Sequence, residues 1–296
     1  MPTIEQVSTS GDGWTTCGRG HRHWGLFGAA GLLLRSEPGT GGAVGLQLRV
    51  GWSHHGGTWG VLGGARGAEE SALQAALREA SEESSVVPAQ VRVEASYRDD
   101  HGGWAYTTVV GSALTPFALG PRGAESDAVR WVPVTEVDGL ALHPGFASSW
   151  PLLRTVGPAP LLVVDAANVV GSRPDGWWRD RAGAARRLRD ALATVAATGI
   201  PAAALQPGAV EGLRLFPEVL LVVEGAARPV EPVPGVEVRA AVGSGDDALV
   251  AVVEERASGG RPVLVATADR ELRRRVQAHD AAVLGPRTLL DLLEAA

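Results

Sequence analysis

The sequence of 296 residues contains no lysine and a single cysteine, Cys17. One cysteine excludes an internal disulfide framework. Hydrophobic residues make up 45% of the chain, yet no run of eighteen apolar residues offers a membrane span. The first residues, MPTIEQVSTSGDG, lack the basic and apolar regions of a secretory signal. These absences predict a cytoplasmic protein with no membrane partner.

Basic charge is also scarce. All 27 basic residues are arginine, a bias typical of a GC-rich genome rather than of a function. Up to residue 160 there are 11 arginines against 15 acids, and after it 16 against 18, so neither half has the basic footprint of a nucleic-acid-binding domain. Arginine clusters at 179–189 and 270–275 and the pair Trp177-Trp178 leave RNA contact open, although a solvated helix face is the commoner use of such clusters.

The length predicts two domains, since domains usually contain about 100–200 residues. The segment TVGPAP at 155–160 interrupts the pattern with glycine and two prolines, and an apolar strand follows at once. We therefore predict domains at 1–154 and 161–296, joined by a linker at 155–160. Apolar runs at 24–34, 43–50, 105–114 and 129–133 predict strands of the first domain, and 146–154 a final helix.

Residues 64–86, GARGAEESALQAALREASEESSV, hold the strongest chemical signal of the chain. Glu79, Glu82 and Glu83 are spaced three and four residues apart, which places their carboxylates on one face of a helix. Such like-charged pairs cost a helix about 0.2–0.5 kcal/mol each, and a bound cation would remove that cost. Arg78 lies four residues before Glu82 and would orient its carboxylate.

Carboxylate oxygens favour Mg²⁺ or Mn²⁺, and Mg²⁺ binds through one or two carboxylates together with the phosphates of its substrate. We therefore expect a divalent cation that is completed by a diphosphate, with Glu70 as a further ligand. Gly63 and Gly64 are expected to let a loop turn sharply before the helix. The alternative is a plain amphipathic surface helix with its glutamates in water.

The spacing Gly64, Glu70, Arg78-Glu79, Glu82-Glu83 resembles the Nudix box, the metal and diphosphate signature of hydrolases that act on nucleoside diphosphate derivatives. Two positions depart from it: Leu62 stands where Pro-Gly-Gly usually opens the loop, and Ser85 where the family has glycine. A serine in the left-handed conformation of a helix end would cost about 1 kcal/mol. HWGLFGAAGLLLR at 23–35, WSHHGGTWGVLGG at 52–64, and Glu125 with Trp131-Val132-Pro133 resemble the flanks of the box.

The resemblance implies an α/β/α sandwich with a mixed sheet for the first domain, and hydrolysis of a diphosphate bond in a nucleotide-type substrate. It implies that Glu70, Glu79, Glu82 and Glu83 bind Mg²⁺ or Mn²⁺, that Arg78 belongs to the catalytic set, and that one of the box glutamates is the general base in many members.

The second domain alternates strands with helices, which predicts an α/β fold with a mostly parallel sheet. Ligands of such sheets bind at the carboxyl ends of the strands, where Asp165, Glu224 and Asp269 are expected. Each acid alone has a simpler role as a helix cap or turn residue. Converging carboxylates would need a metal, as in phosphodiesterases. The series Asp165-x-x-Asn168, Asp246-Asp247 and Thr267-Ala268-Asp269 resembles the PIN-like superfamily, particularly its NYN branch of ribonucleases. The resemblance implies metal-binding acids at Asp165, Asp246 or Asp247, and Asp269, with Asn168 as a polar helper.

Histidines and tryptophans provide weaker signals. Cys17, His21 and His23 form a Cys-x3-His-x-His run, but no second ligand cluster stands at zinc-site spacing, so we expect solvated or packed loop residues. His54-His55 are expected at the surface. Trp52, Trp59 and Trp104 would stack a base or, more commonly, belong to the core or its rim.

Taken together, the sequence predicts a two-domain enzyme whose first domain is a metal-dependent pyrophosphohydrolase. An alternative is an RNA-processing protein in which the first domain trims a 5′ diphosphate or cap and the PIN-like domain cuts RNA. A third reading makes one domain a nucleotide-binding sensor without turnover.

Overall fold

Two compact units make up the chain, and they divide between Gly157 and Pro158. The computed structural model describes residues 10–37, 41–174, 176–257 and 259–295. Residues 1–9, on which the secretory-signal argument partly rests, lie outside the described residues. In the part of the chain that is described, no helix combines the length and apolar character needed to cross a membrane.

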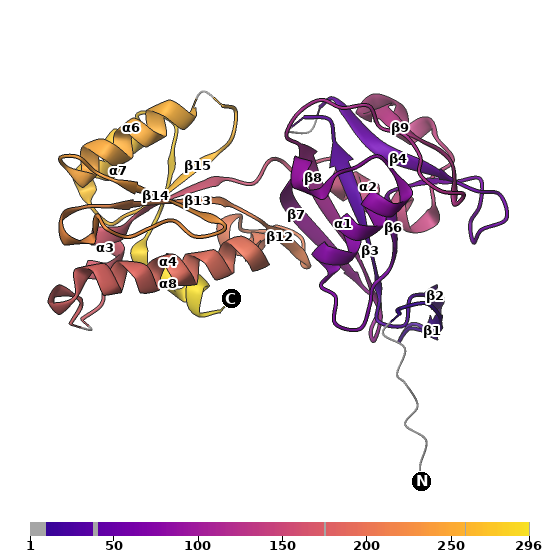
Figure 1. The fold of residues 1–296 in the computed structure, drawn as a ribbon, viewed down its shortest axis with the longest axis horizontal. Coiled ribbons are helices and arrows are strands. Elements are labelled where there is room, and N and C mark those ends of the chain that lie inside the picture. Colours follow the sequence, from indigo (N-terminus) through magenta and orange to yellow (C-terminus); the bar gives the residue numbers. More distant parts are fainter. Residues whose placement is uncertain (1–9, 38–40, 175, 258, 296) are drawn as a thin grey trace, which may run out of the picture. The chain divides into compact units, whose positions relative to one another are not determined.

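The first unit is built on a mixed sheet, as predicted (Figure 1). Strands β3 and β8 pair in parallel, and the other strands of this unit's sheet pair antiparallel in the order β7-β8-β3-β4-β5, with β6 on β3 and β9 on β4. A separate two-stranded ribbon, β1-β2, precedes it. The strands are β1 (Trp14–Thr16), β2 (Arg22–Trp24), β3 (Ala29–Arg35), β4 (Ala43–Arg49), β5 (Trp59–Gly60), β6 (Leu62–Ala65), β7 (Val91–Asp100), β8 (Ala105–Ala113) and β9 (Ser126–Pro133).

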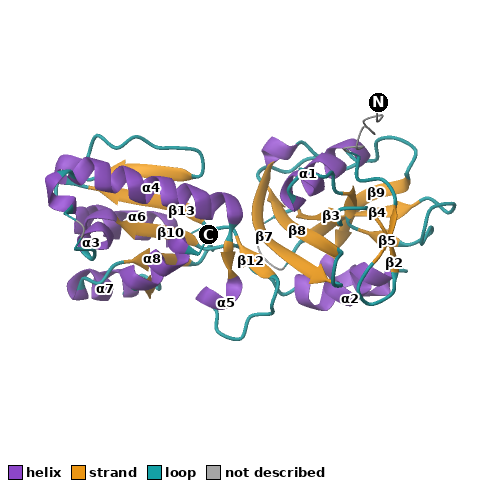
Figure 2. Cartoon of the chain, turned by 90° about the horizontal axis from the view of Figure 1, so that it is seen from below, coloured by secondary structure: helices purple, strands orange, loops and turns teal. Residues whose placement is uncertain are grey.

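Helices α1 (Ala72–Glu83) and α2 (Pro144–Leu153) lie on opposite sides of this sheet (Figure 2). Helix α1 begins at Ser71, whose hydroxyl accepts from the Gln74 backbone while the Gln74 side chain accepts from the Ser71 N–H, a reciprocal cap. Its buried face of alanines packs on β3, β6 and β8. Short 3₁₀ turns, η1 (Pro88–Gln90) and η2 (Val134–Gly139), complete the unit. The carboxylate-bearing positions of α1 are thereby held against a rigid sheet.

The second unit contains a five-stranded parallel sheet in the order β14-β13-β10-β15-β16, so the predicted parallel sheet is present. Its strands are β10 (Leu161–Asp165), β13 (Glu218–Val223), β14 (Val236–Ala240), β15 (Val263–Ala266) and β16 (Ala282–Leu284). Its helices are α3 (Ala166–Gly171), α4 (Arg181–Thr198), α6 (Gly245–Ala257), α7 (Arg270–Gln277) and α8 (Pro286–Glu294). Smaller pieces are β11 (Ile200–Pro201), α5 (Ala202–Leu205), β12 (Leu213–Leu215), η3 (Trp177–Arg179) and η4 (Gly225–Ala227).

Helices cover both faces of the parallel sheet. Helices α3, α4 and α8 bury their apolar side chains on one face, and α6 and α7 on the other (Figure 1). Strand β10 is consequently buried at every position, which explains why its first four residues, 161–164, are all apolar. The carboxyl ends of the strands, where the polar residues begin, form one edge of the sheet.

Candidate functional site

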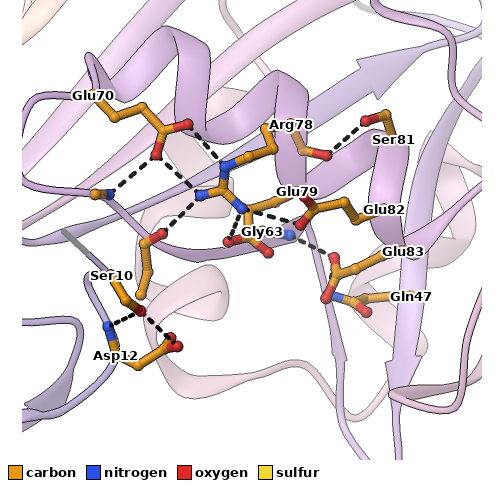
Figure 3. A network of polar contacts seen from close by, with 12 residues as sticks. Ser10, Asp12, Gln47, Gly63, Glu70, Arg78, Glu79, Ser81, Glu82 and Glu83 are labelled. Atoms are coloured by element: carbon orange, nitrogen blue, oxygen red, sulfur yellow. Dashed lines mark hydrogen bonds and ion pairs between the residues drawn. The ribbon is translucent and has the colours of Figure 1, made fainter. Parts of the chain in front are cut away.

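Arg78 joins three glutamates of the first unit (Figure 3). Its guanidinium makes two hydrogen bonds to Glu70, of 2.8 and 3.0 Å, and further contacts of 2.8 Å to Glu79 Oε1 and 3.0 Å to Glu82 Oε2. It also donates to the Ala65 carbonyl at 3.0 Å. Glu70 precedes α1 while the other three residues lie on it, so a single cation fixes the loop to the helix.

Glu83 ends helix α1 and is buried, with 8% of its surface exposed. Its Oε2 accepts from the Gly63 N–H at 2.8 Å and from Gln47 Nε2 at 3.1 Å. Gln47 is fixed in turn, because its amide also donates to the Val61 carbonyl and its Oε1 accepts from the Ser126 hydroxyl at 2.6 Å. This carboxylate is therefore held in one orientation by groups of β4, β6 and β9.

Burial and mutual repulsion shift the acidities at this site. Burial and, after it, the negative charge of Glu79 raise the pKa of Glu83 to about 8, against the opposing hydrogen bonds from Gln47 and Gly63. Burial also raises the pKa of Glu79, although the contact with Arg78 partly offsets it. Glu70 differs, since its hydrogen bonds from Arg78 lower its pKa. Arg78 thus favours the ionised form of Glu70, whereas burial disfavours the ionised forms of Glu79 and Glu83.

The donor set of this site fits a hard divalent cation. Three carboxylates surround the Arg78 guanidinium, and the charge of one of them, Glu79, acts on the fourth, Glu83. The contacts between described residues engage Oε1 of Glu79 and Oε2 of Glu83, while the partner oxygens take no part in them. Oxygen ligands of this kind suit Mg²⁺ or Mn²⁺. Burial, together with the repulsion of neighbouring carboxylates, raises the pKa values of Glu79 and Glu83, and a bound cation would offset both effects.

Gly63 and Gly64 do not form a turn, so that prediction is wrong. Both lie in strand β6, paired with β3, and neither has a positive φ. They are required by close approach instead: a Cβ on Gly63 would lie 2.4 Å from the Ala30 carbonyl oxygen, and a Cβ on Gly64 would lie 2.6 Å from Glu79 Oε2. Glycine therefore lets β6 lie close to the backbone of β3 at Gly63 and to the Glu79 carboxylate at Gly64.

Ser85 does not adopt the left-handed conformation whose cost the sequence predicted. Helix α1 ends at Glu83, the following cap residue Ser84 is extended with φ −146° and ψ 179°, and Ser85 is not among the described residues with a positive φ. The Ser85 hydroxyl donates to the Ala118 carbonyl at 2.9 Å and accepts from the Gly120 N–H at 3.1 Å. The chain therefore leaves the helix as a segment bound to residues 118–120, where glycine would offer no advantage.

Two residues of this site, Gln47 and Ser126, were absent from the sequence prediction, and Glu125 was present only as part of a flank. Glu125 precedes β9, and its charge raises the pKa values of both Glu79 and Glu83. The available signal for Gln47 was a single amide inside the apolar run GLQLRV. A buried polar side chain needs a partner, which is the property that marks it as part of a site.

Aromatic and histidine residues occupy several environments. Trp52 is 77% exposed, whereas Trp104 is 7% exposed and donates its indole N–H to the Gly25 carbonyl. Arg130 lies over the ring of Trp59 at 4.9 Å. His54 and His55 are exposed and lie with His143 so that their ligand atoms are within 4.8 Å of one another. Cys17, by contrast, is buried.

The second unit brings acids together at the carboxyl edge of its sheet. Asp165 ends β10, is 8% exposed, and accepts from the Asn168 N–H and the Thr267 hydroxyl, each at 3.0 Å. Burial raises its pKa, and the charges of Asp246 and Glu224 raise it further. Burial likewise raises the pKa of Asp246, to which the charge of Asp269 contributes.

Hydrogen bonds at that edge also give several of its residues structural roles. Asp165 and Asp269 cap helices α3 and α7, and the Asn168 side chain accepts from the Ala268 N–H at 2.8 Å. Asp247 instead pairs with Arg275 at 2.7 Å and its side chain is 72% exposed. Of the two alternatives left open by the sequence, Asp246 is therefore the one whose charge acts on Asp165.

Comparison with known proteins gives concordant matches to the first unit. Residues 26–156 match the NUDIX domain family. A Mycobacterium tuberculosis protein named "Putative 8-oxo-dGTP diphosphatase 3" is 47% identical over 160 residues, which cover 51% of this chain and 72% of that protein. The crystal structure of a Nudix hydrolase from M. smegmatis, RenU, shares 46% identity, with a TM-score of 0.44, over 49% of this chain and 93% of that one.

A third relative has a different length. The "Nucleoside triphosphate pyrophosphatase/Nudix hydrolase fusion protein" of Bifidobacterium longum is 40% identical over 156 residues. These residues cover 51% of this chain but only 32% of the fusion protein, so the match concerns about a third of that relative.

Proposed function

The chain belongs to the Nudix hydrolase family, and we propose that its first unit hydrolyses the diphosphate bond of a nucleoside triphosphate or nucleoside diphosphate derivative with Mg²⁺ or Mn²⁺. The observation that supports this most is the buried carboxylate of Glu83, held by the Gly63 N–H and Gln47 beside the cluster around Arg78. A buried carboxylate on which the charge of Glu79 acts is suited to binding a cation.

Nudix enzymes generally use divalent metal ions. In this chain Glu79, Glu82 and Glu83 would hold the ion, with Glu70 in support. When bound, the ion would offset the charge of a diphosphate and make a nearby water more acidic. Arg78 orients Glu70, Glu79 and Glu82 through its three contacts, and Gln47 with the Gly63 N–H orients Glu83, so the ligands are positioned before substrate arrives.

Glu83 is the residue to which we assign the general-base role. Burial and the charge of Glu79 raise its pKa to about 8, and a base whose pKa lies near the working pH accepts a proton most effectively. The proton of the attacking water would pass to the Glu83 carboxylate, and Gln47 would keep that carboxylate in place. Glu125 adds negative charge nearby that favours proton uptake.

The names of the relatives supply the first substrates to test. We propose 8-oxo-dGTP as the leading substrate because the M. tuberculosis relative is named "Putative 8-oxo-dGTP diphosphatase 3". A panel of ordinary and oxidised nucleoside triphosphates, dinucleotides, nucleotide sugars and capped RNA, each with Mg²⁺ or Mn²⁺, distinguishes small-molecule hydrolysis from RNA 5′-end removal. Tight nucleotide binding without product on any of them would favour the sensor function instead.

Gly64→Ala tests whether the placement of Glu79 matters. The added methyl would lie 2.6 Å from Glu79 Oε2, so the carboxylate must move, and a displacement near 1 Å costs about 10²-fold in rate. Steady-state kinetics should therefore show kcat/KM lowered by about 10²-fold. The matched control is Gly60→Ala in β5, where a Cβ meets only the His143 Cβ at 3.6 Å. Equal rates for both variants would contradict the assignment of Glu79.

For the second unit we propose a PIN-like fold with metal-dependent cleavage of RNA as a second activity. The support is the group Asp165, Glu224, Asp246 and Asp269, whose charges act on one another at the carboxyl edge of the parallel sheet. Burial and, after it, the charges of neighbouring acids raise the pKa values of Asp165 and Asp246, and a divalent cation would favour their ionised forms. Asn168 joins two strand ends by its bond to Ala268 and would keep this edge rigid.

Asp165→Asn should abolish cleavage of single-stranded RNA by the full chain with Mn²⁺ while leaving nucleotide hydrolysis unchanged. The amide keeps the cap on α3 but removes the charge that a cation requires. Gel assays of end-labelled RNA would measure the loss, with Asp247→Asn as the control because Asp247 is paired with Arg275. RNA cleavage that survives Asp165→Asn would remove this activity from the second unit.

A further inference from the structure

A cysteine and three histidines lie close together in the first unit. None of them belongs to α1 or to its cluster of glutamates. The ligand atoms of Cys17, His21, His23 and His101 all lie within 4.8 Å of one another. The first three come from the ribbon β1-β2 and its turn, and His101 comes from the hairpin between β7 and β8. The sequence shows the first three as a Cys-x3-His-x-His run, and only the fold supplies the fourth.

Two nitrogen atoms in this cluster are buried and unbonded. His23 Nε2 and His101 Nδ1 are shielded from solvent and have no hydrogen-bond partner among the described residues. A buried polar atom without a partner usually costs about 1–3 kcal/mol, so its presence in both rings calls for a partner of another kind. A metal ion placed between the rings would satisfy both atoms at once.

The other nitrogen of His101 is already positioned for metal binding. Its Nε2 lies 3.1 Å from Asp99 Oδ2. A histidine that ligates a metal commonly donates its second ring N–H to a carboxylate, which fixes the tautomer and leaves the other nitrogen free to bind. Asp99 therefore directs the lone pair of Nδ1 toward the cluster.

The backbone holds the two segments together at this point. The Cys17 N–H donates to the His21 carbonyl and the Gly20 N–H to the Cys17 carbonyl, each at 2.9 Å, which folds residues 17–21 into a tight turn. Gly20 adopts a left-handed φ of +80° that the turn requires. The Gly18 N–H donates to the Gly102 carbonyl at 2.5 Å and joins this turn to the β7-β8 hairpin.

We propose that Cys17, His21, His23 and His101 bind one Zn²⁺ ion in a closed tetrahedral site that joins the β1-β2 ribbon to the β7-β8 hairpin. One thiolate and three imidazoles are ligands that zinc prefers, and four protein ligands leave no position open for substrate. Bond lengths of about 2.0–2.3 Å place tetrahedral ligand atoms about 3.3–3.6 Å apart, so the side chains would move inward by about 1 Å on binding.

The local packing explains why such a site would be needed. The ribbon β1-β2 is a separate two-stranded sheet, an arrangement that is only marginally stable in water. Its apolar support is a small cluster of Cys17, Ala29 and Trp104 with Tyr106 against it. Trp14 and Trp24 of the ribbon remain 42% and 44% exposed. A structural zinc compensates for a core too small to hold a segment.

The second histidine group is the weaker candidate. His54, His55 and His143 offer three ligands, two of them exposed, and His143 Nδ1 accepts a hydrogen bond from the Gly145 N–H at 3.2 Å as the cap of α2. It contains no thiolate. The group provides a control, because His54→Ala removes an exposed histidine outside the Cys17 cluster.

Metal analysis of the full-length protein tests the proposal. Protein produced in zinc-supplemented medium and passed over a weak chelating resin should retain about one zinc ion per chain. Cys17→Ser and His101→Ala should lose it, whereas His54→Ala and Glu79→Gln should keep it. Zinc absent from the wild type, or lost with His54→Ala or Glu79→Gln and retained by Cys17→Ser, would overturn the assignment.

Cobalt substitution of the wild type avoids dependence on variants that fail to fold. Because Cys17 is the single cysteine of the chain, a thiolate-to-Co²⁺ charge-transfer band would identify it as a ligand without ambiguity. Co²⁺ added to chelator-treated protein should give this near-ultraviolet band together with the intense visible absorption of a tetrahedral ion, and Zn²⁺ should displace both. A weak octahedral spectrum without the thiolate band would place the cobalt elsewhere and contradict the proposal.

Asp99→Ala should weaken zinc binding by about 10- to 100-fold, the usual effect of removing a carboxylate that orients a metal-binding histidine. Competition with a chromophoric chelator measures this affinity directly, whereas a purely structural role for Asp99 would leave it unchanged. Asp127→Ala, which alters an exposed aspartate of β9, is the matched control. Equal affinities for both variants would contradict the role assigned to Asp99.

Discussion

Glu83→Gln is expected to lower kcat for nucleotide hydrolysis by about 10²–10⁴-fold, the range that removal of a general base produces. The amide has the size of the carboxylate and still offers an oxygen to the Gly63 N–H and to Gln47, so the packing at the end of α1 is preserved. It cannot accept a proton at neutral pH and carries no charge for a cation. The variant should therefore fold normally and bind nucleotide more weakly with Mg²⁺ than the wild type does.

The measurement is initial-rate kinetics on the nucleotide panel, with thermal unfolding to establish that the fold survives. Glu69→Gln is the matched control, because it makes the same chemical change at an exposed residue next to Glu70. A Glu83→Gln enzyme with a near-normal rate would remove Glu83 from the mechanism. If the wild type itself hydrolyses nothing but binds nucleotide tightly, the sensor function gains weight and Asp165 becomes the next residue to test.

The carboxylate face of α1 could be predicted because its determinants are local. Residues three and four apart share a helix face whatever the rest of the fold does, and the capping pair Ser71 and Gln74 sets the start of this helix from within it. The buried strands of the second unit follow from the same kind of rule, since an uninterrupted apolar run such as 161–164 has to be covered on both sides.

The prediction that Gly63 and Gly64 form a turn was wrong because the sequence does not show which atoms pack against a glycine. At Gly64 the relevant neighbour is the Glu79 carboxylate, which only the packing of α1 on β6 brings close. The strand β7 was missed for a related reason: its pairing shifts register between Val93 and Ala95, and its sequence carries five charges, so the regular alternation of a strand is broken.

The remaining site residues could not be predicted because their partners are distant in sequence. Gln47 meets Glu83 across 36 positions, and Ser126 meets Gln47 across 79. His101 joins Cys17 only through the pairing of β7 with β8 and the turn that contacts it. In each case the residue type alone does not indicate a functional site. The site forms only when the fold brings the distant partners together.

The acidity of Glu83 leads to a second large effect, on stability without metal. In the folded protein its pKa is about 8, against an ordinary value of 4.5. Between these values the unfolded chain loses the Glu83 proton while the folded chain keeps it, so the unfolded state binds fewer protons and stability falls as pH rises. The stabilisation is complete below pH 4.5 and is lost by about pH 8. Over this pH range the free energy of unfolding should fall by on the order of 2–4 kcal/mol, an amount that allows for relaxation of the protein around the ionised carboxylate.

Urea unfolding of EDTA-treated protein at several pH values would measure this slope. Other titrating groups contribute as well, so the quantity to compare is the difference between the wild type and Glu83→Gln, in which the glutamine cannot ionise. That difference should grow with pH in favour of the variant up to about pH 8 and then level off. Mg²⁺ should restore the wild type and not the variant, because a cation lowers the cost of the ionised carboxylate. A difference that is flat with pH would mean that Glu83 is ionised in the metal-free protein, and the base would then have to be sought among the other acids that face α1.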